Sequence, residues 1–158
     1  MDSGRRRFPR GGRGCVRTAA LALVLALMIS SPSRGEKVTS AGLEAAVTTE
    51  KATYQVGEPI TMTLRVSSRT GDEVRLHFSS AQRFDFAIRD ARGRQVWRWS
   101  EEQIFAQVLE TEALGPARPQ ITYRAQFRGN LAPGSYSVEA TLVAKDRPLS
   151  ATLVIEVQ

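Results

Sequence analysis

The stretch ITMTLRV, residues 60–66, decides the fold class of this chain. Large apolar side chains occupy every second position, and threonine or arginine occupies the positions between them. Successive side chains of a β-strand point to opposite faces, whereas a helix repeats its apolar positions with a period near 3.6. The period of two therefore predicts a strand with one buried face.

The same alternation recurs along the rest of the chain. Five further segments show it: residues 74–78, 84–88, 121–127, 136–142 and 153–157. Turn-forming Gly, Pro, Asp and Asn residues separate the segments at intervals of roughly ten residues, as expected between short strands. Many short alternating strands predict an all-β fold, namely an antiparallel β-sandwich of the immunoglobulin-like type.

One segment departs from this pattern. Ser100 precedes Glu101, Glu102 and Gln103 in the way that an N-cap residue precedes a helix. We expect a short helical turn near residues 101–105, which leads into a strand over residues 107–114.

The charge of the chain is concentrated at its amino terminus. The 158 residues contain 22 Lys and Arg against 16 Asp and Glu, a formal net charge of +6. Residues 1–35 hold seven arginines and one aspartate, so residues 36–158 are neutral. A neutral domain gives no electrostatic reason to expect nucleic acid or an anionic membrane as a partner.

The basic leader has the layout of a signal peptide. An arginine-rich n-region, residues 1–17, precedes twelve uncharged residues, 18–29, that are too few to span a membrane as a helix. Small residues then favour cleavage near residue 35, with residues 39–41 as a second site. The alternative is an uncleaved anchor. We therefore expect export to the periplasm or the exterior, with no stable membrane insertion after processing.

Two features of the leader bear on the export route. Arg5-Arg6-Arg7-Phe8 resembles a twin-arginine signal, but Pro9 departs from that pattern, so we favour Sec export. Cys15 lies before the apolar run rather than after it, which argues against a lipoprotein. As the only cysteine, Cys15 also excludes an intrachain disulfide.

Residues 36–158 lack a recognisable catalytic pattern. His77 is the only histidine and is predicted on the exposed face of its strand. The carboxylates lack the spacing of a metal-binding loop, and the glycines are scattered singly rather than forming a phosphate loop. We therefore predict a protein that is not an enzyme, with no catalytic, metal or cofactor residues and no cofactor.

Arginines cluster on one predicted hairpin, yet acidic residues flank them, so a solvated face of mixed charge is favoured over an acidic partner. The cluster comprises Arg89, Arg92, Arg94 and Arg98.

Both tryptophans lie in one short stretch, VWRWS at residues 96–100. Spaced by two on a strand, Trp97 and Trp99 would share a face with the aromatic residues of the preceding strand. Such a group most often belongs to a core. The alternative is that one tryptophan remains at the rim, with Phe105, to anchor a protein partner.

These residues carry a resemblance to a known family. The strand SSAQRFDF at residues 79–86, the turn RDARG at 89–93, the VWRWS stretch, Phe105 and the PGSY sequence at 133–136 together resemble the BsuPI family of bacterial intracellular proteinase inhibitors. The likeness runs over nearly all of residues 36–158. In two places, residues 115–119 and Phe127, the sequence departs from the usual family pattern.

The resemblance implies an immunoglobulin-like domain over residues 36–158 and a role in binding a protein, namely a serine proteinase. The contact residues we expect are Trp97, Arg98, Trp99, Ser100 and Phe105, and residues 115–120 form a second candidate loop. A second function stays open at this point: an accessory or adhesion module outside the cytoplasm that binds an envelope protein or a glycan.

Overall fold

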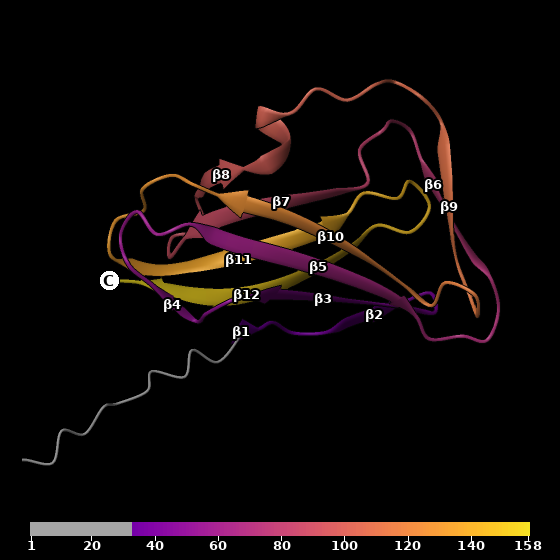
Figure 1. Ribbon diagram of the computed structural model, residues 1–158, viewed down its shortest axis with the longest axis horizontal. Helices are drawn as coiled ribbons and strands as arrows, with labels where there is room; N and C mark the ends of the chain where they lie inside the picture. Colours follow the sequence, from indigo (N-terminus) through magenta and orange to yellow (C-terminus); the bar gives the residue numbers. More distant parts are fainter. Residues whose placement is uncertain (1–32) are drawn as a thin grey trace, which may run out of the picture.

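Two sheets, antiparallel except where β4 pairs with β12, pack face to face in the computed structural model, which describes residues 33–158 (Figure 1). The order β1-β3-β5-β10, with β2 added beside β3, forms the first sheet, and the order β4-β12-β11-β7-β8 forms the second. A separate two-stranded sheet joins β6 to β9. The bounds are β1 Ser33–Arg34, β2 Val38–Ser40, β3 Leu43–Thr49, β4 Thr53–Tyr54, β5 Ile60–Ser68, β6 Val74–Phe78, β7 Phe84–Asp90, β8 Gln95–Arg98, η1 Trp99–Glu102, β9 Glu110–Leu114, β10 Gln120–Phe127, β11 Gly134–Leu142 and β12 Leu149–Val157.

The alternation in the sequence accounts for the core. In β5 the four apolar positions are at most 1% exposed, and the residues between them are not buried. Strands β6, β11 and β12 show the same alternation, with their apolar residues directed between the layers. Because each sheet buries one face against the other, period-two segments on both sheets close a single core. The predicted all-β sandwich is confirmed.

The strand order is that of an immunoglobulin-like sandwich. Strands β3, β5 and β10 correspond to A, B and E, and β12, β11 and β7 correspond to G, F and C. A hydrogen bond supports this assignment: the Tyr136 hydroxyl, near the start of β11, donates to the Ala132 carbonyl oxygen at 2.9 Å. Such a tyrosine corner at the start of strand F is a hallmark of the fold.

The helical turn lies earlier than the sequence predicts. It is a single 3₁₀ turn over Trp99–Glu102, not a turn over residues 101–105, and Ser100 lies inside it. The N-cap is Arg98, whose side chain makes no capping hydrogen bond. Ser100 is therefore not an N-cap, because its amide and hydroxyl are drawn to a carboxylate on β7. The following strand is also shorter than predicted and begins at Glu110.

The predicted leader lies almost wholly outside the described residues. The n-region at 1–17 and the apolar run at 18–29 lie outside the described residues, and only the end of the leader, from residue 33, is described. Ser33 and Arg34 pair with β3, and the Glu36 amide donates to the Thr152 carbonyl oxygen of the other sheet at 3.1 Å. The predicted cleavage point thus follows directly on β1. Within residues 33–158 no helix is long and apolar enough to cross a membrane.

Candidate functional site

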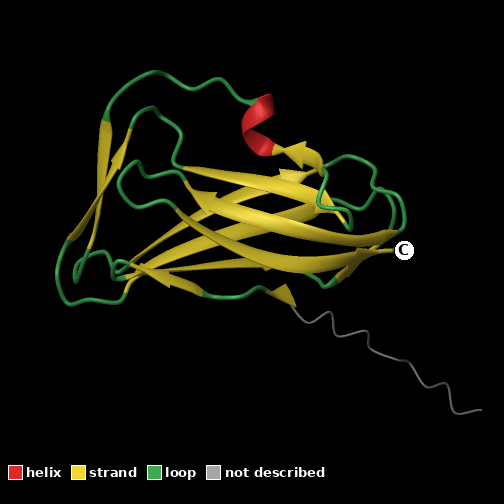
Figure 2. Ribbon diagram, turned by 180° about the vertical axis from the view of Figure 1, so that it is seen from behind, coloured by secondary structure: helices red, strands yellow, loops and turns green. Residues whose placement is uncertain are grey.

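The VWRWS segment forms an exposed edge of the second sheet. Its strand, β8, pairs only with β7, and η1 continues directly from it above the sandwich (Figure 2). The structure brings all five predicted contact residues to this edge. Each of them makes contacts that hold the segment in place.

A buried carboxylate organises the segment from below. Asp85, on β7, is only 4% exposed. Its Oδ2 accepts hydrogen bonds from Arg98 Nε at 2.6 Å and Ser100 Oγ at 2.8 Å, and its Oδ1 accepts from the Ser100 amide at 3.1 Å and the Phe86 amide at 2.9 Å. The hydrogen bond with Asp85 also raises the pKa of the Arg98 guanidinium. The Asp85 side chain thereby satisfies four donors. This explains why FDF at residues 84–86 and WRWS at residues 97–100 occur together in the sequence.

Four aromatic rings contact one another in a row from the loop after η1 into the sandwich, three of them stacked and the outermost tilted. Trp99 lies 4.3 Å from Phe84 at an interplanar angle of 19°, and Phe84 lies 4.9 Å from Tyr123. On the outer side, Phe105 contacts Trp99 at 5.6 Å. We call Phe105, Trp99, Phe84 and Tyr123 the aromatic row. Because Phe84 belongs to β7 and Tyr123 to β10, the row connects the loop to both sheets.

Trp97 lies outside this row. Its ring meets Phe127 edge-on at 5.4 Å, and its Nε1 donates to Glu102 Oε1 at 2.7 Å. Both tryptophans pack against the core while remaining partly exposed. Trp99 belongs to η1 rather than to a strand, so the two rings do not simply share one strand face.

The loop at residues 103–109 joins η1 to β9 and arches away from the sandwich (Figures 1 and 2). It contains neither a turn nor a bend, and its first residue, Gln103, has extended backbone angles. Ile104 is fully exposed, Leu109 is 87% exposed and Val108 is 44% exposed. Large apolar side chains on a monomer surface in such density mark an interaction site.

Both halves of this loop are fixed to the body. The Ala81 amide donates to the Ala106 carbonyl oxygen at 2.9 Å, and Phe105 beside it ends the aromatic row. At the far end Glu110 pairs with Arg83 at 2.5 Å. The loop is therefore held in the middle and at its carboxyl end while its apolar side chains point to solvent.

Arg83 is the centre of that second attachment. Its Nε donates to Glu112 Oε1 at 2.8 Å, its Nη1 donates to the Ser80 carbonyl oxygen at 2.9 Å, and its guanidinium lies 4.7 Å from the centre of the Phe78 ring. Only 15% of the Arg83 side chain is exposed. We call Arg83, Glu110 and Glu112 the arginine clamp.

The clamp also touches the aromatic row. The Tyr123 hydroxyl donates to Glu112 Oε2 at 3.4 Å. Burial raises the pKa of the Tyr123 phenol, and the charge of Glu112 raises it further. Tyr123 therefore stays a neutral donor throughout the physiological range, which suits its place between the row and the clamp.

The second candidate loop, residues 115–120, has a different structure. The Gly115 amide donates to the Arg118 carbonyl oxygen at 3.0 Å, and the Arg118 amide returns the bond to Gly115 at the same distance. This turn is closed by its own hydrogen bonds. An extended segment that pairs with a partner needs free backbone groups, so residues 103–109 suit that role better.

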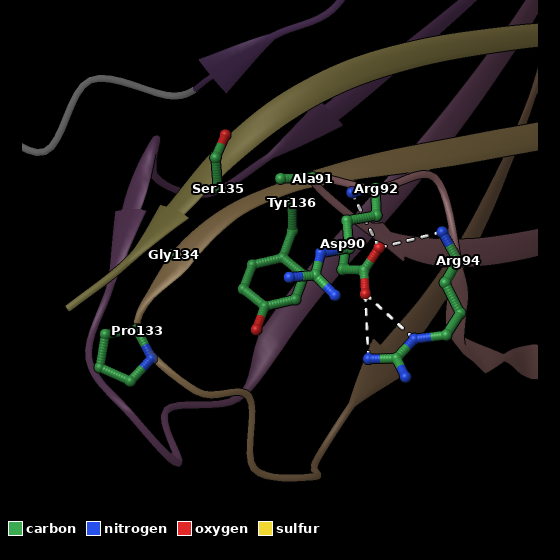
Figure 3. Close-up of a pocket in the computed structure, with 8 residues that line it drawn as sticks. All are labelled: Asp90, Ala91, Arg92, Arg94, Pro133, Gly134, Ser135 and Tyr136. Carbon is green, nitrogen blue, oxygen red and sulfur yellow. Dashed lines mark hydrogen bonds and ion pairs between the residues drawn. The ribbon is translucent and has the colours of Figure 1, made fainter.

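A shallow pocket lies between the β7–β8 turn and the start of β11, and Figure 3 shows the residues that line it. Asp90 closes the turn after β7: its Oδ1 accepts from the Arg92 and Arg94 amides at 3.0 and 2.9 Å, and its Oδ2 accepts from Arg94 Nε at 3.1 Å. The pocket has a volume of about 220 Å³, which is below the usual range for small-molecule sites. The Asp90 carboxylate that lines the pocket is already occupied by the hydrogen bonds of the turn.

Three of the four arginines in the predicted cluster form ion pairs with acidic residues, which agrees with a face of mixed charge. Arg89 meets Glu139 at 3.2 Å, in addition to the pairs of Arg94 and Arg98 already described. His77 lies on the exposed face of β6 and contacts Thr111 Oγ1 at 3.2 Å. No group of three His, Cys, Asp or Glu side chains that could hold a metal occurs within residues 33–158.

The residues that sequence reasoning missed fall into two groups. The buried Asp85 and the clamp residue Arg83 take positions that a strand pattern assigns to solvent. Ile104, Val108 and Leu109 are apolar, so their exposure runs against the usual expectation, and the sequence predicted the last two within a strand. Their spacing gave no signal, because Ile104 and Val108 are four residues apart and that separation suits either a strand or a helix.

The strand order, the tyrosine corner and the exposed edge define the class of protein: an immunoglobulin-like β-sandwich that carries a constrained loop. The family follows from comparison with known proteins. The BsuPI family, described as "Intracellular proteinase inhibitor", matches residues 47–147, which is more than half of the chain. The chain therefore belongs to the BsuPI family, as its motifs predicted.

This membership corrects the predicted location. The leader led us to expect export to the periplasm or the exterior. The family, however, is described as intracellular, so that prediction is wrong. The accessory or adhesion role outside the cytoplasm depended on the same prediction and loses its basis with it.

Three solved structures show a partial likeness to this chain at low sequence identity. The C-terminal domain of wzt is 10% identical with a TM-score of 0.49, and the comparison covers 78% of each chain. Spo0M, a sporulation control protein from Bacillus subtilis, is 14% identical with a TM-score of 0.49, over 75% of this chain and 50% of Spo0M. The Pseudomonas fluorescens DNA glycosylase AlkC is 16% identical with a TM-score of 0.44, over 76% of this chain and 31% of AlkC. No curated protein matches the chain.

Proposed function

We propose that this chain is a non-enzymatic inhibitor of a serine proteinase and that it presents the loop at residues 103–109 to the active-site cleft of that enzyme. The segment Trp97, Arg98, Trp99, Ser100 and Phe105 forms the base of the contact surface. The family description supports inhibition of a proteinase. The observation that carries the proposal is the extended loop itself, which exposes Ile104 and Leu109 while both of its attachments are fixed.

The attachments matter because binding orders flexible groups. Each immobilised side chain and each ordered loop residue opposes association, so a loop that is already held in the bound shape binds more tightly. Ala106, three residues before Leu109, is held by a backbone hydrogen bond, and Glu110, directly after Leu109, is held by Arg83. The segment between them can therefore enter a cleft with little loss of conformational freedom.

The roles within the contact segment differ. Asp85 already engages Arg98 and Ser100, so these two residues fix the backbone of η1 at the root of the loop. Trp99 and Phe105 fix its first half through ring stacking. Trp97 remains partly exposed at the edge and extends the surface that the partner covers.

An inhibition assay tests the proposal. The full chain is titrated against several serine proteinases of differing specificity, with a cysteine proteinase and a metalloproteinase as comparisons, and residual cleavage of small chromogenic peptides is measured. We expect inhibition of at least one serine proteinase at micromolar protein. Unchanged activity of every serine proteinase in the panel would overturn the proposal.

A further inference from the structure

We infer that Leu109 is the primary specificity residue of the loop, the side chain that fills the S1 pocket of the proteinase, and that the partner is a serine proteinase with an apolar S1 pocket. This inference rests on the proposed function and adds the residue and the specificity class. Three observations support it: the Leu109 side chain is exposed, the backbone of residues 107 and 108 before it makes no hydrogen bond with the described part of the chain, and Glu110 after it is held by Arg83.

Leu109 presents its side chain almost entirely to solvent at the boundary between the loop and β9. A proteinase binds the residues before the scissile bond as an extended strand, through their main-chain groups. Within residues 33–158, the backbone of 107–109 forms no hydrogen bond with the rest of the chain. Three consecutive residues are therefore exposed, lie outside any turn or bend, and have backbone groups free to pair with the enzyme.

Ile104 is more exposed than Leu109 but fits the role less well. The residue before it, Gln103, is extended, but its amide already donates to the Ser100 carbonyl oxygen at 3.3 Å. The residues before Gln103 belong to the 3₁₀ turn, so only one residue on the amino side of Ile104 is extended and its amide is not free to pair with an enzyme. Ile104 is also β-branched, which restricts its side chain close to the backbone, whereas leucine branches one atom further out.

The carboxyl side of Leu109 is fixed by the arginine clamp. Glu110 pairs with Phe78 as the first residue of β9, and its carboxylate meets Arg83. During attack by the proteinase, the serine oxygen bonds to the Leu109 carbonyl carbon, the peptide bond to Glu110 breaks, and the serine proton passes through the histidine to the Glu110 nitrogen. The clamp keeps the Glu110 amine in place. The amine therefore attacks the ester again, which re-forms the peptide bond and releases the serine unchanged.

The S1 pocket of the partner follows from the chemistry of the residue. A leucine side chain fills an apolar pocket such as that of chymotrypsin, whereas the S1 pocket of trypsin carries a carboxylate and accepts arginine or lysine. Burying leucine against that carboxylate would leave a charge without a partner. The wild-type chain should therefore inhibit enzymes that cleave after large apolar residues and should leave trypsin active.

The test replaces Leu109 in the full chain and measures inhibition constants for a chymotrypsin-like or subtilisin-like enzyme and for trypsin. We expect Leu109→Gly to weaken inhibition of the apolar-specific enzyme at least about 30-fold, as for other central anchors of an interface. Leu109→Arg should lose that inhibition and gain inhibition of trypsin. Val154→Ala, an exposed apolar residue on β12, serves as the matched control and should change neither constant more than about twofold.

The outcomes separate the two claims. If the wild type inhibits a serine proteinase but Leu109→Gly inhibits it equally well, or if Leu109→Arg leaves trypsin fully active, the assignment of Leu109 is overturned and the proposed function stands. If the wild type inhibits no serine proteinase, the proposed function falls and this inference falls with it. Thermal unfolding of each variant verifies that the loop change leaves the fold intact.

Discussion

Asp85 and Ser100, fifteen residues apart in the sequence, meet through two hydrogen bonds. The Ser100 hydroxyl donates to Asp85 Oδ2 at 2.8 Å and the Ser100 amide donates to Asp85 Oδ1 at 3.1 Å. The contact fastens η1 to β7 beneath the exposed edge. The root of the candidate inhibitory loop is thereby set by a buried carboxylate rather than by the intrinsic helical preference of its own sequence.

Removing that carboxylate should destabilise the domain. We expect Asp85→Ala to lower the free energy of unfolding by about 2–4 kcal/mol, because buried donors on Ser100 and Phe86 lose their acceptor. Ser100→Ala removes only one hydrogen bond and should lower it by about 1 kcal/mol. Chemical denaturation measures both. Equal effects of the two variants would contradict the central role of Asp85.

The aromatic row predicts a linked loss of stability and inhibition. Trp99→Ala should reduce the free energy of unfolding by about 2–3 kcal/mol, because Phe84 and Phe105 both lose a stacking partner. The inhibition constant should rise as well, because Phe105 no longer fixes the loop. Acrylamide quenching of the wild type should show partial access to both tryptophans. Two fully protected tryptophans would contradict the exposed edge.

The arginine clamp should decide whether the protein is an inhibitor or a substrate. In Arg83→Met the long apolar side chain can still cover Phe78, but Glu110 loses its charged partner. We expect hydrolysis after Leu109 by the target enzyme to accelerate about tenfold, which corresponds to roughly 1.4 kcal/mol. Mass spectrometry of timed digests detects the new amino terminus at Glu110. The same hydrolysis rate in the variant and the wild type would show that the clamp does not retain the amine.

Acid should weaken the turn that Asp90 closes. Partial burial acts to raise the pKa of Asp90, but hydrogen bonds from the Arg94 and Arg92 amides and the Arg94 guanidinium outweigh it and leave the pKa below its usual value. Because the folded-state pKa is lowered, the contribution to stability is present above about pH 4 and is lost as pH falls through the folded-state value. The stability gap between wild type and Asp90→Asn should therefore be widest near neutrality and close in acid. A gap that widens in acid would contradict this sign.

The core could be predicted from the sequence because burial and strand geometry impose the same period. Ile60, Met62 and Leu64 are nearly inaccessible, as their alternation requires. Asp85 could not be predicted, since it occupies a polar position in its strand and becomes buried only because Arg98 and Ser100 fold over it. Tertiary partners, not local preference, determine its environment.

The candidate loop was mispredicted for a related reason. The sequence assigned Val108 and Leu109 to a strand because apolar residues usually seek a core. The structure begins β9 only at Glu110, where strand pairing with Phe78 starts and the carboxylate meets Arg83. The sequence does not distinguish an apolar residue that is exposed for binding from one that is buried in the core. Only the folded structure shows which of the two environments the residue has.

Occupation of the proteinase active site is the most direct test of this account. The full chain is mixed in excess with the serine proteinase that it inhibits most strongly, and the enzyme is then treated with a fluorescent phosphonate that labels the catalytic serine. We predict that labelling falls in proportion to the fraction of enzyme in the complex, because residues 103–109 fill the cleft. Labelling at the full rate, while gel filtration shows an intact complex, would contradict the claim that this loop enters the active site.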